Sequence, residues 1–328
     1  MLGCLLRHGI LRSLALILPD AISLSLIAAL SAILLAANPP LLVDDFYHLS
    51  VSRQICVSGF IPTWDFWEFA PLGRPHLYPP LLHLAMAFLI KASGGEVLLA
   101  AKVVKASVYP LLLLLFWLSV RGLEGREAAL YSTLTLASAS PLLLLATMIM
   151  PATVALAITP PLLLSFIKRK TLTSALLLSA AMWLHVSMPL TAAASLLAFS
   201  LVKRDGYPKL FIKVASISTI TYLPWLLHVA NHAGWLSPAQ ASGSPFIPFT
   251  VWALALPSMA STLRHKDSGC LAFLLYALSL TLLVGYTTRF SVYLLLPASF
   301  FTGVTLSRIM WNRRKLKAAL IVILAASF

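Results

Sequence analysis

The chain of 328 residues is 60% hydrophobic and only 10% charged, with a mean hydropathy of +0.92. Soluble domains carry about 25% charged residues, so this composition excludes a water-soluble fold. Many apolar runs approach the ~20 residues that cross a bilayer as a helix. The composition therefore predicts an all-α protein, a polytopic bundle of transmembrane helices.

The net charge of +14 raises the question of a nucleic-acid partner. The basic residues, however, cluster between the apolar runs, as the positive-inside rule expects of a membrane protein. We therefore expect membrane lipids as partners and no nucleic acid. Cys4, Cys56 and Cys270 lie far apart in the sequence, which argues against a disulfide framework or a zinc site built from cysteine pairs.

The first predicted span covers residues 14–37. Arg7 and Arg12 precede it and place the N-terminus in the cytoplasm, so residues 38–80 form an external loop on the extracytoplasmic side. The next apolar stretch, residues 81–90, is too short to span comfortably. We predict a re-entrant or interfacial helix there.

The remaining spans follow from the apolar runs and from the side on which basic residues fall. With a last apolar run at 318–328, they give about 10–11 spans in a single transmembrane domain, residues 1–328, in the cell membrane. Most of the 24 Lys and Arg residues then face the cytoplasm, and the exceptions are Arg53, Arg74, Lys91, Lys102, Lys105 and Arg289. The predicted spans are 104–120, 128–145, 153–167, 172–186, 190–202, 214–229, 249–263, 271–285 and 291–307.

The external loop holds four of the ten acidic residues of the chain. Asp44 and Asp45 come directly after the first span. Carboxylates in this position can bind Mg²⁺ or Mn²⁺ through hard oxygen ligands, or act as a general base; a solvated loop end is the alternative. His48 follows Asp44 by four residues, so the two share one face if the segment is helical.

A second polar cluster lies later in the loop. Trp64, Asp65 and Glu68 combine aromatic rings with carboxylates, a pattern that suits either sugar binding or an aromatic belt at the membrane interface. Arg74 and His76 follow and could bind phosphate oxygens or lipid headgroups, because the forked donors of arginine fit such oxygens.

Arg289 stands at the outer boundary between two apolar runs. A cation at membrane depth is costly and indicates a function, so Arg289 is predicted to pair with a lipid-linked phosphate, or else to reach the headgroups. The sequence contains no nucleotide-binding motif. If the protein transfers a chemical group, a donor molecule that already sits in the membrane therefore fits this sequence better than a soluble nucleotide.

The external loop resembles that of the GT-C superfamily of membrane glycosyltransferases, which use polyprenyl-phosphate-linked sugars, and in particular archaeal oligosaccharyltransferase catalytic subunits. The resemblance implies a bundle of GT-C type, a lipid-linked sugar donor as partner, and Asp44 as metal ligand and acceptor-orienting residue, with Asp45 the near alternative. A later R-F-x-x-Y segment is similar to a helix start in these enzymes. The matching positions are Asp44, Tyr47–His48, Gly59 to Pro62, Trp64–Asp65, Tyr78 to Pro80, and Arg289, Phe290 and Tyr293.

The chain departs from these enzymes in its second acidic motif. Residues 146–154 contain no carboxylate, and the sequon-binding motif and the soluble domain are absent from this sequence. We therefore expect transfer of one sugar to a lipid, glycan or protein hydroxyl rather than protein N-glycosylation. Two alternatives stay open: a secondary transporter or lipid flippase, and a non-catalytic relative that acts as a structural partner.

Overall fold

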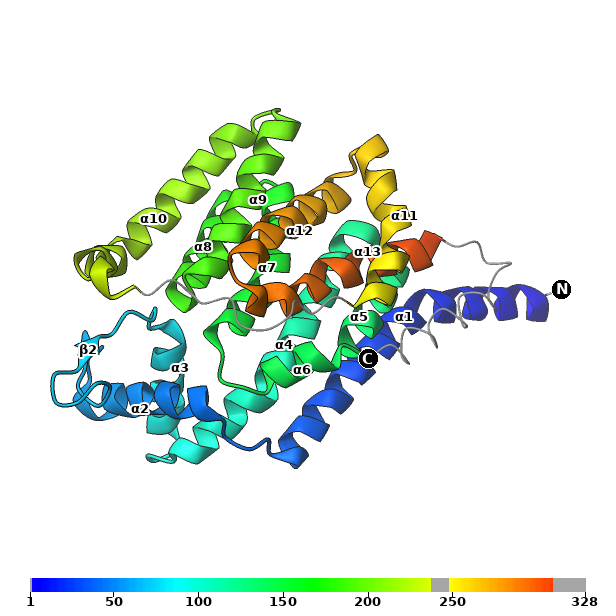
Figure 1. Ribbon diagram of the computed structural model, residues 1–328. Coiled ribbons are helices and arrows are strands. Elements are labelled where there is room, and N and C mark those ends of the chain that lie inside the picture. The colour runs from blue at the N-terminus through cyan, green and yellow to red at the C-terminus, as the bar shows by residue number, and fades with distance from the viewer. Residues whose placement is uncertain (1, 237–247, 309–328) are drawn as a thin grey trace.

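A computed structural model describes residues 2–236 and 248–308, apart from the side chains of residues 2–16, 286 and 289. This part of the chain is almost entirely helical (Figure 1). The α-helices are α1 (Leu2–Ala37), α2 (Val43–Ser58), α3 (Leu81–Ala92), α4 (Val97–Glu124), α5 (Arg126–Ala137), α6 (Ser140–Ala146), α7 (Pro151–Ile167), α8 (Thr171–Leu184), α9 (Ser187–Lys203), α10 (Tyr207–Asn231), α11 (Phe249–His265), α12 (Ser268–Tyr286) and α13 (Leu295–Arg308). Two 3-10 helices, η1 (Ala233–Trp235) and η2 (Thr288–Leu294), and a hairpin of β1 (Trp64–Asp65) and β2 (Arg74–Pro75) complete it.

The bundle is built around α4, which packs against α1, α5 and α7. One group of helices, α8, α9 and α10, extends from α7, and α11 and α13 extend from α5. The outer helices expose large apolar side chains, such as Ile33 on α1 (59% exposed) and Ile220 on α10 (68%). Apolar side chains on the outside are stable in lipid and costly in water, so the protein is a multi-pass membrane protein.

Every predicted span within the described residues falls on a helix or a helix pair, which confirms the helical bundle. By length and apolar composition, α1, α4, α10, α12 and the η2–α13 segment can each cross a membrane. The predicted span 128–145 is broken into α5 and α6, which meet at 74°. Pro141 stands in the first turn of α6, where its missing N–H cannot continue the hydrogen bonding of α5. The predicted run 318–328 lies outside the described residues.

The external loop folds into α2, the hairpin and α3, which Figure 1 shows together at one side of the bundle. The α2 helix ends at Gly59, which adopts φ +80°. At the hairpin turn, Gly73 has φ +73°, and a Cβ there would meet the Trp64 ring and the Asp65 carbonyl. The α3 helix has 12 residues and packs on α2 and α4. This length is too short for a crossing, as predicted for residues 81–90.

Candidate functional site

Asp44 and Asp45 lie in the first turn of α2 and face different surroundings. Neighbouring residues of a helix are rotated by about 100°, so two adjacent side chains point in different directions. The Asp45 side chain is fully buried, whereas Asp44 is exposed. The two carboxylates, equivalent in the sequence, therefore have different roles in the fold.

Asp45 joins three segments of the chain. Its Oδ2 lies 2.5 Å from Nζ of Lys105 on α4 and accepts the N–H of Leu42 at 2.9 Å. Its Oδ1 accepts the N–H of Ile149, between α6 and α7, at 2.6 Å. Lys105 also donates to the Pro40 carbonyl at 2.5 Å. Both buried charges are thus paired and hydrogen-bonded, the arrangement that a buried ion pair needs.

Asp44 lines a cavity of about 120 Å³ between α2 and the start of α7. The structure gives the Asp44 carboxylate no hydrogen bond or ion pair with any residue it describes. His48 lines the same cavity, which confirms that these two residues share one face of a helix. The other lining residues are Tyr78, Leu145, Met150, Pro151, Ala152, His185, Phe290 and Tyr293.

A buried polar network supports this wall of the cavity. His48 Nδ1 lies 2.8 Å from Nε2 of His83 on α3, a distance that requires one shared proton. Behind them, the Tyr47 hydroxyl is 2.8 Å from both Asp65 Oδ2 and His76 Nδ1. Burial, and then the charge of Asp65, raises the pKa of Tyr47, so its hydroxyl keeps its proton. The contact with His83 holds the His48 ring in this wall of the cavity.

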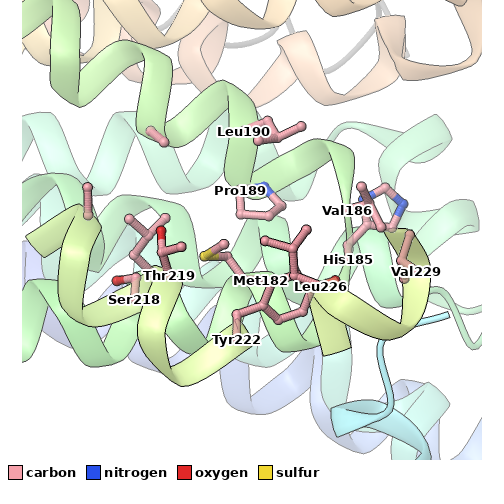
Figure 2. Close-up of a pocket in the computed structure, with 13 residues that line it drawn as sticks. Met182, His185, Val186, Pro189, Leu190, Ser218, Thr219, Tyr222, Leu226 and Val229 are labelled. Carbon is pink, nitrogen blue, oxygen red and sulfur yellow. The ribbon is translucent and has the colours of Figure 1, made fainter. Parts of the chain in front are cut away.

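An apolar groove of about 310 Å³ begins beside the cavity and runs between α8, α9 and α10 (Figure 2). Its walls include Met182, Pro189, Leu190 and Leu226, and its few polar groups are hydroxyls and one imidazole. That imidazole belongs to His185, which also lines the Asp44 cavity. A polar compartment and an apolar compartment therefore meet at one side chain.

No family model and no curated protein match this sequence. Solved structures do match its fold. ArnT from Cupriavidus metallidurans, bound to undecaprenyl phosphate, superposes with a TM-score of 0.70 at 16% identity over 92% of this chain and 63% of its own. The oligosaccharyltransferase AglB from Archaeoglobus fulgidus, with an inhibitory peptide and a dolichol-phosphate, gives a TM-score of 0.71 at 12% identity over 94% of this chain and 54% of its own. The Archaeoglobus fulgidus oligosaccharyltransferase in complex with Zn and sulfate gives a TM-score of 0.51 at 13% identity, over 92% of this chain and 51% of its own.

The chain has the GT-C fold. It spans about half to two thirds of the length of these solved GT-C glycosyltransferases. The resemblance seen in the external loop thus extends to the whole described bundle.

Several predicted substrate-binding residues of this GT-C chain lie away from the cavity. Glu68 forms an ion pair with Arg74, whose guanidinium lies 5.9 Å from the centre of the Tyr47 ring. Trp64 packs edge-on against His232 and Trp235 after α10. These residues join the hairpin to the bundle, and their contact with substrate stays a prediction.

Asp65 and His76 are fully buried and bonded to each other at 3.0 Å, with neither among the cavity-lining residues. Asp65, Glu68 and His76 thus do not line the cavity with Asp44, and their contact with substrate stays a prediction. The side chain of Arg289 lies outside the described residues. Its neighbour Phe290 lines the cavity, so its predicted contact with a lipid-linked phosphate stays open.

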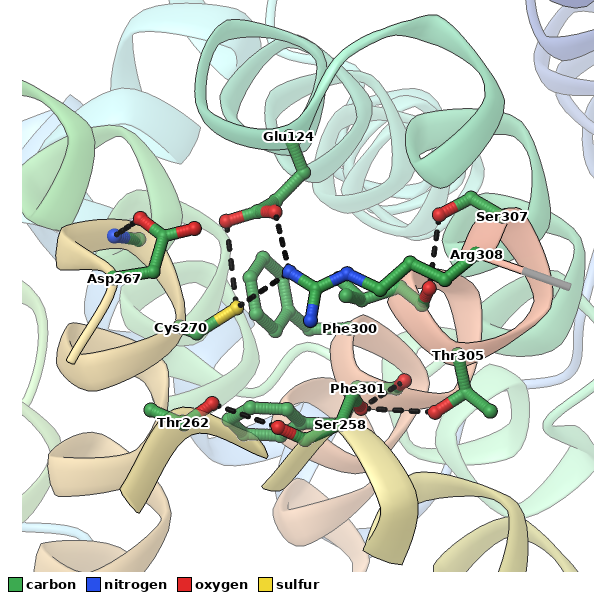
Figure 3. A network of polar contacts seen from close by, with 12 residues as sticks. Glu124, Ser258, Thr262, Asp267, Cys270, Phe300, Phe301, Thr305, Ser307 and Arg308 are labelled. Atoms are coloured by element: carbon green, nitrogen blue, oxygen red, sulfur yellow. Dashed lines mark hydrogen bonds and ion pairs between the residues drawn. The ribbon is translucent and has the colours of Figure 1, made fainter. Parts of the chain in front are cut away.

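The predicted Mg²⁺ or Mn²⁺ site at Asp44 and Asp45 does not fit this arrangement. Every Asp45 oxygen already accepts a hydrogen bond, which leaves one carboxylate facing the cavity. Hard cations bound by protein alone need several oxygen ligands. Across the described residues, metal-ligating atoms gather only in Glu124, Asp267 and Cys270, within 4.8 Å of one another (Figure 3).

That cluster lies at the opposite end of α4 from Lys105, and it already has a cation. The Arg308 guanidinium is 3.6 Å from the Glu124 carboxylate and 3.9 Å from Cys270 Sγ. It is separate from the Asp44 cavity.

Sequence reasoning assigned no role to Lys105 or His83. Lys105 was placed among the external charges, although a lysine inside a 28-residue apolar helix signals a buried partner. His83 stands in an apolar run, and this isolation is the signal that was available for it.

Acidification is expected to loosen the contact between α2 and α3. Burial lowers the pKa of His48 to about 4, with the charge of Asp45 opposing this shift, and burial lowers the pKa of His83 well below its ordinary value. In the unfolded chain a histidine takes up its proton near pH 6.5. Between pH 6.5 and 4 the opened state thus binds more protons than the folded state. The contact therefore loses stability as the pH falls, by up to about 1.4 kcal/mol per pH unit for each histidine.

Cys56 on α2 can report this opening, because it packs beside the α2–α3 contact. In a Cys4→Ser/Cys270→Ser protein, the alkylation rate of Cys56 is divided by its rate in the denatured protein at the same pH. This ratio should rise as the pH falls from 7 to 5. His48→Gln should flatten part of that rise. A protected Cys56 at both pH values would show that the histidines are not coupled to the contact.

Proposed function

We propose that this protein transfers a glycosyl group from a polyprenyl-phosphate-linked donor to a hydroxyl acceptor. One observation carries this proposal: Asp44, a carboxylate with no partner among the described residues, lies in a polar cavity that adjoins an apolar groove. A lipid-linked sugar has the same two parts, a polar head and an apolar tail. The ArnT and AglB structures, with bound undecaprenyl phosphate and dolichol-phosphate, support a donor of this class.

In the proposed reaction, Asp44 accepts the proton of the acceptor hydroxyl as general base. The acceptor oxygen then attacks the anomeric carbon of the sugar, and the bond from that carbon to the phosphate oxygen breaks. Polyprenyl phosphate leaves with the electron pair, and the anomeric configuration is inverted. The cavity takes the sugar and the acceptor oxygen, and the groove takes the tail.

We further propose that the cavity faces the extracytoplasmic side and that the N-terminus is cytoplasmic. The basic segments 168–170 and 203–204 lie at the ends of α8–α10 that are remote from His185, as the positive-inside rule requires. A flippase would need ionisable residues near the middle of its spans, and the described spans have few. The enzyme therefore fits better than the transporter.

The experiment that tests this function uses purified full-length protein in detergent. Radiolabelled polyprenyl-phosphate sugars are incubated with a membrane lipid extract, with Mn²⁺ or with a chelator, and the products are separated. Transfer of label to a new acceptor supports the proposal. A folded protein that binds polyprenyl phosphate but leaves the donor intact would be a non-catalytic relative.

Filling the groove should weaken donor use while leaving the fold intact. Thr219 is exposed on α10 and lines the groove, so Thr219→Trp places an indole where the tail would lie. Ile220, its exposed neighbour, does not line the groove, and Ile220→Trp is the matched control. We expect KM for the lipid donor to rise about tenfold in Thr219→Trp and to stay unchanged in Ile220→Trp. A tenfold rise corresponds to the loss of about one or two kcal/mol of apolar burial of the lipid tail. Equal KM values in both variants would place the tail elsewhere.

A further inference from the structure

His185 occupies the boundary between the two compartments. It follows α8 directly and is the one residue that lines both the Asp44 cavity and the apolar groove in the described structure. Figure 2 shows it at one end of the groove, near Val186 and Val229. A phosphate attached to an apolar tail must lie at such a boundary, because the tail stays in the groove and the charge needs polar partners.

The backbone of α9 fixes the protonation state of His185. Its Nδ1 accepts the N–H of Ser187 at 3.1 Å and the N–H of Met188 at 3.2 Å. A nitrogen that accepts two N–H groups carries no proton, so the ring proton is on Nε2. The ring also stands edge-on to Phe290, with centroids 6.0 Å apart. The imidazole is therefore oriented, with Nε2–H as a donor.

We propose, resting on the function proposed above, that His185 binds the phosphate of the lipid donor through Nε2–H and stabilises the departing polyprenyl phosphate. A fixed N–H donor at this boundary can stabilise the charge that develops on the leaving phosphate oxygen. The α9 helix begins two residues later, and the positive end of its dipole favours an anion at the same place.

The competing reading is that His185 only caps α9. Two substitutions separate these roles, since they imitate different halves of the ring. His185→Asn keeps an acceptor near the position of Nδ1 but has nothing at Nε2. His185→Gln carries an amide N–H to the position of Nε2 but loses the acceptor for Ser187 and Met188.

The test measures two ligands in the full-length protein: a polyprenyl phosphate and the polyprenyl alcohol of equal chain length, both in detergent micelles. Wild type is expected to bind the phosphate more tightly than the alcohol. His185→Asn should lose about tenfold in phosphate affinity, the size of one charge-assisted hydrogen bond, with unchanged alcohol affinity and Tm. His185→Gln should keep most of the phosphate affinity and lower Tm.

Full phosphate affinity in His185→Asn, or an equal loss for phosphate and alcohol, would overturn the proposal and leave His185 as a helix cap. Equal binding of the two ligands by wild type would overturn it as well. Failure of the proposed function has a different signature. A wild type that selects the phosphate over the alcohol through His185 yet transfers no sugar would bind the lipid without catalysis.

Discussion

Replacing Asp44 with asparagine should strongly slow the proposed sugar transfer and leave the fold unchanged. The substitution removes the basic oxygen and keeps the shape of the side chain. General-base catalysis contributes about 10²–10⁴-fold to a rate, so kcat should fall by that factor. Asp44 is exposed and has no ion pair among the described residues, so the free energy of unfolding should change by less than about 0.5 kcal/mol.

The matched control is Glu96→Gln, the same acid-to-amide change at an exposed residue before α4, outside the cavity. Its transfer rate should stay close to that of wild type. The measurement is label transferred from the polyprenyl-phosphate sugar per unit time at saturating donor, with Tm recorded for each variant. Transfer that persists in Asp44→Asn would assign the general base to another residue.

Replacing Asp45 with asparagine should have the opposite signature, a large loss of stability. The change leaves the charge of Lys105 buried without the carboxylate that neutralises it. Removing one member of a buried ion pair costs about 3–5 kcal/mol. The link from α2 to Ile149 weakens with it, so the start of α7, which forms one wall of the cavity, should lose its fixed position.

A second substitution separates this effect from catalysis. In Asp45→Asn/Lys105→Met the unpaired charge is gone, and much of the lost stability should return, measured as Tm or as the midpoint of denaturation in detergent. Some transfer activity should return with it. If Asp45→Asn were as stable as wild type and still inactive, Asp45 rather than Asp44 would be the catalytic carboxylate.

The sequence predicted what depends on neighbouring residues and on composition. The apolar runs gave the helices, and the short run at 81–90 gave a helix too short to cross. The spacing of Asp44 and His48 correctly placed them on one face. The choice between Asp44 and Asp45 was not predictable, because it depends on Lys105, 60 residues away, and on the backbone of Ile149.

Other features were missed because they arise from packing between distant segments. The groove needs α8, α9 and α10 side by side, and no local pattern marks its walls. The position of His185 at the boundary of the cavity and the groove appears only in the folded chain. The burial of His76 also could not be seen in a loop rich in polar residues.

The groove between α9 and α10 opens on the outer surface of the bundle, where Leu190 is 62% exposed and Leu226 is 40% exposed. In a membrane this surface faces the acyl chains of one leaflet. The proposed lipid-linked donor would enter there by lateral diffusion, without passing through water. The reaction should therefore follow surface-dilution kinetics: adding inert lipid or detergent at fixed donor concentration should slow it, because the mole fraction of donor in the membrane sets its rate.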